Sequence, residues 1–474
     1  MPPHILRLGD DRSVVDGFER RRNDMIGKLI FGWRLLLCLI AFAALLGLGH
    51  AAVLGLAEFR SIYDIKPAFG ISALFSLCLA LSSVIVLASY RGQPSEFGIN
   101  ELMQRLVDRG ALKLLLILSV VGCIMHIYAK YSVTYIVPIS CIFEIRFAWE
   151  KVPRDLLPIS VKISSVMGHI LVSMALPALI ISGWKLVTES QNSRQYWVNL
   201  WAFGALIVVG IVYAGFMGSR NAMLLFFVVS LFGLILGLCR VGANLRVMGH
   251  LALLMLIPLT LSVAFSSAVF LDRMTCNDDA TQVQYLKGFE DELPVVYVQS
   301  DPGSIRAKIA AGCEICNATF LYLSHGVINL AKVAAVEERG KPALSNSVFW
   351  IFSRLGVDIR SSDDHLLKRV YGNGGLPLAG SAYHDYGLIG TIVVAIGLGV
   401  MVGFAVLGIS GAAGMVGTIG GLIFLTCYFY TTALSYMFTA TGVMFFPFLA
   451  FGCLFGFAGL ACMPERSRSK DVLR

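Results

Sequence analysis

Long unbroken runs of apolar residues recur along this chain, and they constrain its fold more than any other feature. At a rise of 1.5 Å per residue, about 20 residues cross the ~30 Å hydrocarbon core of a bilayer. Helices satisfy their own backbone hydrogen bonds at that depth. Runs long enough to span occur at about ten places: 29–57, 67–89, 111–129, 165–186, 198–216, 221–238, 247–271, 386–408, 414–430 and 437–460.

The composition agrees with a membrane location. Hydrophobic residues make up 57% of the 474 residues and charged residues 14%, too few polar side chains to cover a soluble globule. Outer-membrane barrels are excluded, because their strands alternate polar and apolar residues over about ten positions. The sequence therefore predicts an all-α polytopic integral membrane protein.

The distribution of Lys and Arg predicts the orientation of the helices. Basic residues concentrate in the segments 1–28, 91–113 and 461–474, and the positive-inside rule places such segments in the cytoplasm. We attribute most of the net charge of +8 to this topology signal. No basic surface interleaved with aromatic residues is evident, so a nucleic-acid partner is not expected.

This orientation divides the chain into parts. The N-terminal tail, 1–28, and the C-terminal tail, 461–474, are expected to be cytoplasmic. The first seven helices occupy 29–271 and the last three occupy 386–460. Between them, the polar block 272–385 is predicted to be one large periplasmic loop.

The large loop is predicted to contain amphipathic helices. Apolar residues recur at helical spacing over Thr319–Glu338, which favours a helix lying on the membrane surface. A second helical piece is expected at Val348–Leu355, with Arg354 near its end. We interpret the acidic cluster at 363–365 as a solvated turn, because no further metal ligands are spaced around it. No metal site and no cofactor are predicted.

A glycine-rich stretch closes this loop and leads into the eighth span. Crowded glycines bring backbone N–H groups close to a ligand; these are Gly372, Gly374, Gly375 and Gly380. His384 follows directly and is expected to face the aqueous side at a helix end. Two interpretations stay open for it: a catalytic group, or a helix-start residue that bonds nearby backbone.

The segment 131–163, between the third and fourth spans, is apolar at first and then charged. It is predicted to be a solvated interfacial helix, a re-entrant segment or an extra crossing, and the sequence leaves these three open. Its Arg146 and Arg154 lie on the outer face, where guanidinium groups match phosphate oxygens bidentately. Arg220, in the turn before the sixth span, is either a snorkelling anchor or a phosphate ligand beside free helix N–H groups.

Three cysteines lie in the large loop: Cys276, Cys313 and Cys316. In an oxidising periplasm two of them can close a disulfide. The C-x-x-C spacing of Cys313 and Cys316 also suits half of a zinc site, but no second pair accompanies it. We therefore favour a structural disulfide and keep metal and redox roles as alternatives.

Three stretches carry a resemblance to a known family. They are GSRNAMLLF from Gly218, YLSHGVINLAKVAAVEERG from Tyr322 and GSAYHDYGLIGTIVVAIG from Gly380. Together with the layout of spans, they resemble the oligosaccharide repeat-unit polymerases of the O-antigen polymerase (Wzy) type. Arg369 and Gly380 also fit the eleven-residue Arg–Gly spacing of some members. Arg146 does not, because Leu157 lies eleven positions beyond it.

The resemblance implies a fold and a reaction. The fold is expected to be related to the GT-C glycosyltransferases, in a bacterial inner membrane with the active site facing the periplasm. The substrate is a glycan on undecaprenyl diphosphate, which is transferred to the next lipid-linked repeat unit; a chain-length regulator is a further possible partner. Diphosphate ligands are expected among the arginines, Arg220, Arg146, Arg154, Arg354 and Arg369. His384 is the expected base, with His325 in reserve.

Two rival functions remain open at this stage. An O-antigen ligase uses the same chemistry with a different acceptor. A lipid-linked oligosaccharide flippase or other transporter belongs to another class. A flippase is disfavoured because it should present a charged cavity within spans that are here nearly free of charge. A cation-coupled carrier is disfavoured because the span cores contain neither Asp nor Glu.

Overall fold

The computed structural model describes most of the apolar helices. It covers residues 11–57, 59–91, 97–132, 152–153, 156–189, 193–217, 220–242, scattered positions between 249 and 268, and 295–297, 304, 314–335 and 378–434. Within these residues, six helices are long and apolar enough to cross a membrane. The prediction of a mostly helical protein with several possible membrane spans is thus confirmed, whereas the count of about ten spans and the GT-C-like fold stay predictions. The predicted spans 247–271 and 437–460 fall largely or wholly outside the described residues, as do most of 131–163 and 272–385.

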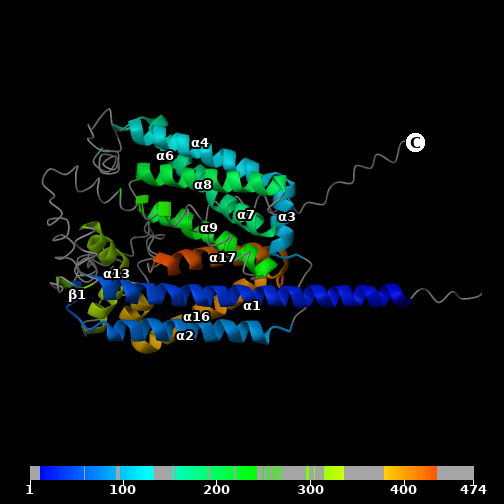
Figure 1. The fold of residues 1–474 in the computed structure, drawn as a ribbon, viewed down its shortest axis with the longest axis horizontal. Helices are drawn as coiled ribbons and strands as arrows, with labels where there is room; N and C mark the ends of the chain where they lie inside the picture. The colour runs from blue at the N-terminus through cyan, green and yellow to red at the C-terminus, as the bar shows by residue number, and fades with distance from the viewer. Residues whose placement is uncertain are drawn as a thin grey trace, which may run out of the picture.

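The helices run back and forth between two ends of one bundle (Figure 1). In the first half the helices are α1 (Asp11–Leu56), α2 (Lys66–Ser89), α3 (Ile99–Asp108), α4 (Ala111–Tyr131), α6 (Ile159–Val172) and α7 (Ala175–Thr188). In the second half they are α8 (Arg194–Met217), α9 (Arg220–Val241), α13 (Glu314–Ala335), α16 (Leu378–Ile409) and α17 (Gly414–Leu434). We call the two ends of the bundle the α3 end and the α13 end.

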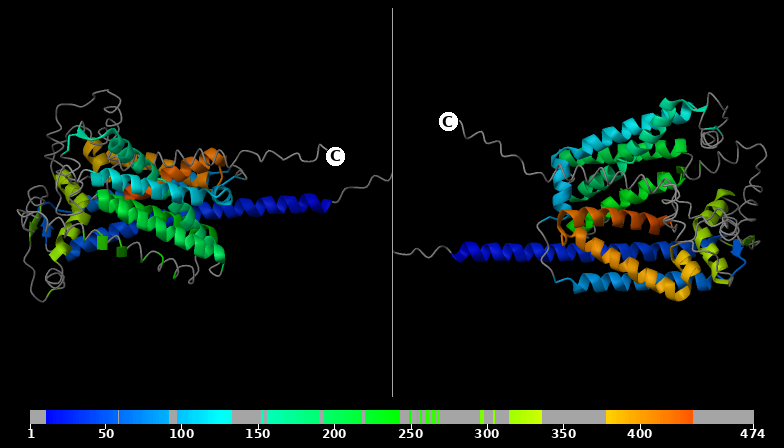
Figure 2. Two further views of the ribbon diagram at one scale, coloured as in Figure 1. Left: turned by 90° about the horizontal axis from the view of Figure 1, so that it is seen from above. Right: turned by 180° about the vertical axis from the view of Figure 1, so that it is seen from behind.

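The α3 end carries the N-terminal part of the chain. Figure 2 shows the long α1 projecting beyond the other helices at this end. The helix begins at Asp11, so much of the predicted N-terminal tail continues the first span as helix. α3 is amphipathic and short, and its apolar side, with Leu102, Met103 and Leu106, is buried. It crosses the ends of the neighbouring helices (Figure 1).

A small sheet ties together segments at the α13 end. β1 (Phe59–Ser61) follows α1 and pairs antiparallel with β2 (Val295–Tyr297), Arg60 lying opposite Val296. The α1–α2 connection and residues 295–297 therefore lie on the same side of the bundle. This arrangement agrees with the predicted placement of the loop, whose periplasmic location stays a prediction.

The predicted fourth span is two helices. α6 packs along α4, whereas α7 packs against α8 and α9. The two helices are separated at Ser173 and Met174. Pro177 explains the break, because a proline lacks an N–H and its ring clashes with the carbonyl four residues earlier, here that of Ser173.

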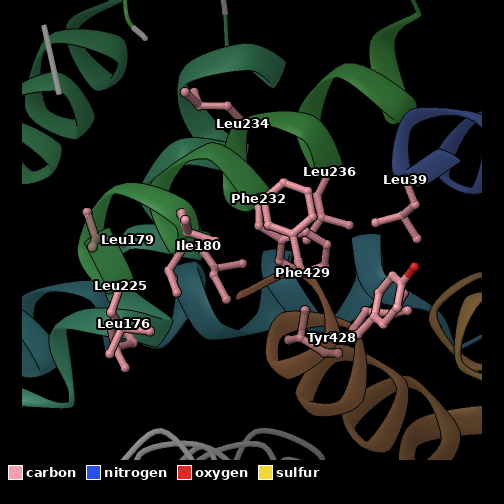
Figure 3. Packing of buried hydrophobic residues seen from close by; sticks show 14 of the residues in the cluster. Leu39, Leu176, Leu179, Ile180, Leu225, Phe232, Leu234, Leu236, Tyr428 and Phe429 are labelled. Atoms are coloured by element: carbon pink, nitrogen blue, oxygen red, sulfur yellow. The ribbon is translucent and has the colours of Figure 1, made fainter. Parts of the chain in front are cut away.

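Aromatic and aliphatic side chains fill the centre of the bundle, where α1, α9 and α17 meet (Figure 3). Phe429 of α17 stacks on Phe42 of α1 with ring centroids 4.0 Å apart, and Phe232 of α9 lies 5.4 Å from it on another side. Because lipid chains are as apolar as these residues, such helices associate through close van der Waals packing. The core thus joins the half containing α2 and α16 to the half containing α4, α6 and α8.

Candidate functional site

The eighth predicted span, 386–408, agrees with the candidate span Tyr386–Ile409, but the helix that contains it begins earlier. α16 starts at Leu378 and includes Gly380, but it bends at Gly387, where φ is 66° and ψ −163°. That backbone region is essentially restricted to glycine. The bend separates a short first segment, which carries His384, from the long apolar segment.

His384 is buried, with 3% of its surface exposed. The prediction that it faces the aqueous side at a helix end is therefore wrong. The reason is that α16 begins six residues before it, which places His384 in the second helical turn, beyond the free N–H groups of the first turn. This position excludes the N-cap role, while a catalytic role stays a prediction.

α13 packs over the same end of the bundle. It contacts α1, α2, α16 and β1, and Ser324 and Asn329 are buried within it. The predicted amphipathic helix is present, between Glu314 and Ala335. Its apolar residues Val327 and Leu330 pack into the protein core instead of on lipid. His325 lies on α13, although its side chain is outside the described residues.

Arg220 opens α9, immediately beyond the end of α8. The backbone thus agrees with the expectation that Arg220 stands beside the free N–H groups of a helix start; its side chain is outside the described residues. Several predicted site residues lie wholly outside them: Arg146, Arg154, Arg354, Arg369, Gly372, Gly374, Gly375, Cys276 and Cys313. Cys316 is placed on α13 by its backbone alone.

Sequence reasoning missed a cluster of polar side chains between α4, α6 and α8. The His169 Nδ1 atom and the Tyr213 hydroxyl are joined by a 2.7 Å hydrogen bond. The His126 ring lies 4.4 Å from the His169 ring and 5.0 Å from the Tyr213 ring, measured between centroids. Lys130, one turn after His126 on α4, is 4% exposed. We call these four residues the histidine cluster.

His126 is fully buried, at 0% exposure, and neither of its ring nitrogens makes a hydrogen bond to any residue that the structure describes. A buried polar group left in this state costs about 1–3 kcal/mol. Ionisable residues within membrane helices mark functional sites by default, because they are expensive to keep there. The burial of His126 and its lack of hydrogen bonds to described residues therefore make it a candidate functional residue.

Two glycines bring the histidine cluster together. A Cβ atom added at Gly122 of α4 would lie 2.4 Å from the Val172 nitrogen, and one at Gly168 of α6 would lie 2.8 Å from the His126 nitrogen. α4 and α6 thus touch backbone to backbone, as small residues allow in membrane helices. The sequence signal was available: a glycine stands four residues before His126 and another directly before His169.

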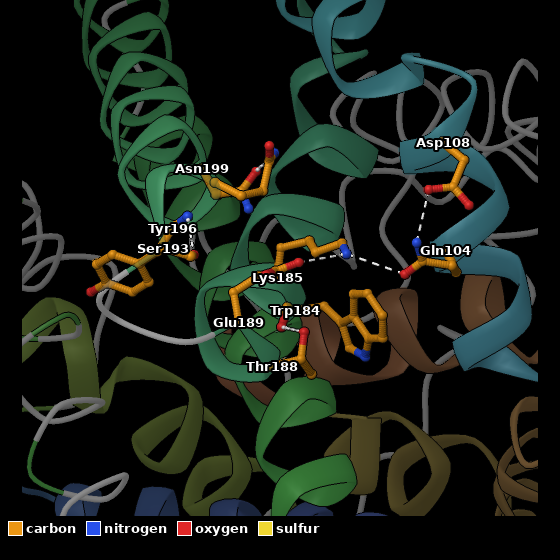
Figure 4. Close-up of polar contacts among 10 residues, drawn as sticks. Gln104, Asp108, Trp184, Lys185, Thr188, Glu189, Ser193, Tyr196 and Asn199 are labelled. Carbon is orange, nitrogen blue, oxygen red and sulfur yellow. Dashed lines mark hydrogen bonds and ion pairs between the residues drawn. The ribbon is translucent and has the colours of Figure 1, made fainter.

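The buried cation at the α3 end has a different environment (Figure 4). Lys185 of α7 donates hydrogen bonds to the Glu189 carboxylate at 2.8 Å and to the Gln104 side-chain oxygen of α3 at 3.2 Å. Gln104 in turn donates to Asp108 at 2.8 Å. This network joins α3 to α7 and accounts for a lysine that is only 6% exposed.

The polar groups at the α13 end do not form one compact site. Figure 1 places α4, α6 and α8, which carry the histidine cluster, at one edge of the bundle, and α2 and α16, which carries His384, at the other. His384 and the histidine cluster thus occupy separate halves of the same end. Among the described residues, no group of three metal-ligating side chains is close enough to hold a metal ion.

No family model, curated protein or solved structure matches this chain. The helices and their composition define only a broad class: a helical protein with several apolar helices that could cross a membrane.

Proposed function

We propose that this chain is a membrane glycosyltransferase that polymerises lipid-linked oligosaccharide repeat units, as its resemblance to the O-antigen polymerases implies. The observation that carries the proposal is the position of His384. This histidine lies on the bent first segment of a spanning helix, at the end of the bundle over which α13 packs. A catalytic site at the membrane boundary suits this reaction, because the donor glycan is anchored in the membrane and the acceptor sugar lies in the aqueous phase.

The reaction needs a base and a stabilised leaving group. The acceptor hydroxyl loses its proton to the base, its oxygen bonds to the sugar carbon, and the bond from that carbon to the diphosphate breaks. His384 takes the proton, since imidazole is suited to this at neutral pH. Fixed cationic donors stabilise the charge on the departing undecaprenyl diphosphate. Arg220 is the one proposed diphosphate arginine whose backbone position is described.

Absence of acids from the spans supports an enzyme over a cation-coupled carrier. None of the six candidate spans contains Asp or Glu. Such carriers ordinarily use an intramembrane carboxylate or broken helices around a midplane site. The resemblance and the distribution of Lys and Arg are the basis for proposing a bacterial inner membrane, with the active site facing the periplasm.

Purified protein supplied with lipid-linked repeat units tests the proposal. The wild type is expected to produce a ladder of longer glycans on a gel. His384→Ala and His384→Gln are expected to lose about 10²–10⁴-fold in rate, the usual contribution of a general base. His50→Gln is the matched control, since His50 lies near the same end of the bundle, on α1.

Two outcomes would contradict the assignment. Normal ladders from both His384 variants at normal protein levels would make His384 structural. No ladder from the wild type, combined with cells that lack all surface glycan when the gene is deleted, would favour the ligase, because loss of a polymerase leaves single repeat units on the surface.

A further inference from the structure

The histidine cluster is rich in hydrogen-bond donors, and the helices that carry it or pack beside it contain no acidic residue. α4, α6, α8 and α9 contain no Asp or Glu at any position. The cluster supplies a lysine ammonium, two imidazoles and a phenol hydroxyl. Lysine has donors only, and imidazole and phenol can both donate. In a dry interior this combination favours an anionic ligand over a cation.

The position of the cluster also limits the ligand. His126 lies five residues before the end of α4, about 8 Å inside the α13 end at 1.5 Å per residue. Tyr213 is similarly close to the end of α8, and Arg220 opens the next helix. His169 lies deeper, ten residues after the start of α6, so the cluster extends from near the α13 end toward the middle of the bundle. We expect a ligand to reach it from the α13 end, where the phosphate groups of membrane lipids would meet the apolar region.

The groups in the cluster are already oriented. The hydrogen bond to Tyr213 fixes the His169 ring through Nδ1. His126 and Lys130 are four residues apart, so they share a face of α4. The close approach of α4 and α6 at Gly122 and Gly168 holds this face against α6. Preorganised donors of this kind bind an anion without the cost of ordering them first.

We propose that His126, Lys130, His169 and Tyr213 form a binding site for the phosphate group of a membrane lipid. His126, whose ring nitrogens bond to no described residue, donates to a phosphate oxygen; Lys130 supplies the positive charge; and Tyr213 holds His169 in place. The assignment of that phosphate to the polyprenyl diphosphate carrier rests on the proposed function. The proposal that the site binds a phosphate group does not rest on that function.

Ligand-induced stabilisation of the purified full-length protein in detergent tests this site without measuring polymerisation. A ligand that binds the folded state raises its unfolding temperature. Polyprenyl diphosphate is expected to raise it and unphosphorylated polyprenol is not. Inorganic diphosphate and phosphatidylglycerol separate the sources of the phosphate. His126→Leu and Lys130→Met are expected to weaken binding by roughly 10–100-fold, the range for one hydrogen bond to a charged group.

The controls separate binding from folding. Lys113→Met removes an exposed cation near the start of α4, at the α3 end, and is expected to bind as the wild type does. Tyr213→Phe keeps the ring and is expected to weaken binding less than His126→Leu, since Tyr213 acts through His169.

The measured stabilisation either supports or overturns the phosphate site. Stabilisation by phosphatidylglycerol equal to that by polyprenyl diphosphate supports the phosphate site and assigns it to bulk lipid. Equal stabilisation of the wild type and His126→Leu, or no stabilisation by any phosphate ligand, overturns the site. The proposed function fails separately, if His384 variants polymerise normally while phosphate binding is intact.

Discussion

Buried ionisable side chains lie toward both ends of this bundle, but their hydrogen bonding differs between the two ends. At the α3 end, Lys185 is held by Glu189 and Gln104 in a network that crosses from α7 to α3. At the α13 end, His126 is buried more completely, yet its ring nitrogens bond to no described residue. A satisfied polar group specifies how helices pack. An unsatisfied one costs stability, and we infer that it is retained for binding.

The largest effect is expected where α4 meets α6. Gly122→Leu places a side chain where even a Cβ would lie 2.4 Å from backbone, so the helices must separate. We expect a loss of about 3 kcal/mol in the free energy of unfolding, at the upper end for overpacking. Denaturation in mixed detergent micelles measures it.

Gly70→Ala is the matched control for this change, because nothing lies within 4 Å of a Cβ at Gly70 on α2. It is expected to be neutral or to stabilise by up to about 1 kcal/mol, since glycine is a poor helix former. If Gly122→Leu were as stable as the wild type, α4 and α6 would not approach backbone to backbone.

Removal of the partnered cation is expected to destabilise the α3 end. Lys185→Met leaves Glu189 and Gln104 without their shared donor. The expected loss is about 2 kcal/mol, below the 3–5 kcal/mol for a fully buried ion pair. Partial rehydration explains the difference, since the Glu189 side chain is 25% exposed. The double variant Lys185→Met/Glu189→Met should recover much of the loss; failure to do so would argue against a specific pair.

Replacement of His126 is expected to change the stability in the opposite direction. His126→Leu eliminates two buried nitrogens that bond to no residue the structure describes, and it should raise the free energy of unfolding by about 1 kcal/mol. The same denaturation experiment, without added lipid, measures this change. A loss similar to that of Lys185→Met would show that His126 is structural, and the contrast between the two ends would disappear.

The smallest effect is expected at an exposed pair on α3. Arg105 and Glu101 form a 2.6 Å ion pair whose side chains are both more than 40% exposed. Exposed helical pairs contribute about 0.3–0.5 kcal/mol, so Glu101→Gln should change stability by no more than that. A loss above about 1 kcal/mol would mean that the polar network at the α3 end extends to its surface.

Several features of the fold followed from the sequence. Apolar runs without Asp or Glu predicted helices long enough to span at the positions of α1, α2, α4, α8 and α16, and apolar helices at those of α9 and α17. The short turn before Arg220 predicted the start of α9. These features are local, because a run of apolar residues and its length are fixed by neighbours in the chain. The break between α6 and α7 was also readable from Pro177, although the apolar run obscured it.

The arrangement of the polar groups was decided by tertiary structure. His126, His169 and Tyr213 are far apart in sequence and meet because Gly122 and Gly168 let two helices touch. His384 is buried within a helix that begins upstream of it and bends at Gly387. The sequence by itself determined which segments are helical and apolar. Which faces of those helices meet depends on side-chain volumes on both partners, and only the packed bundle contains that information.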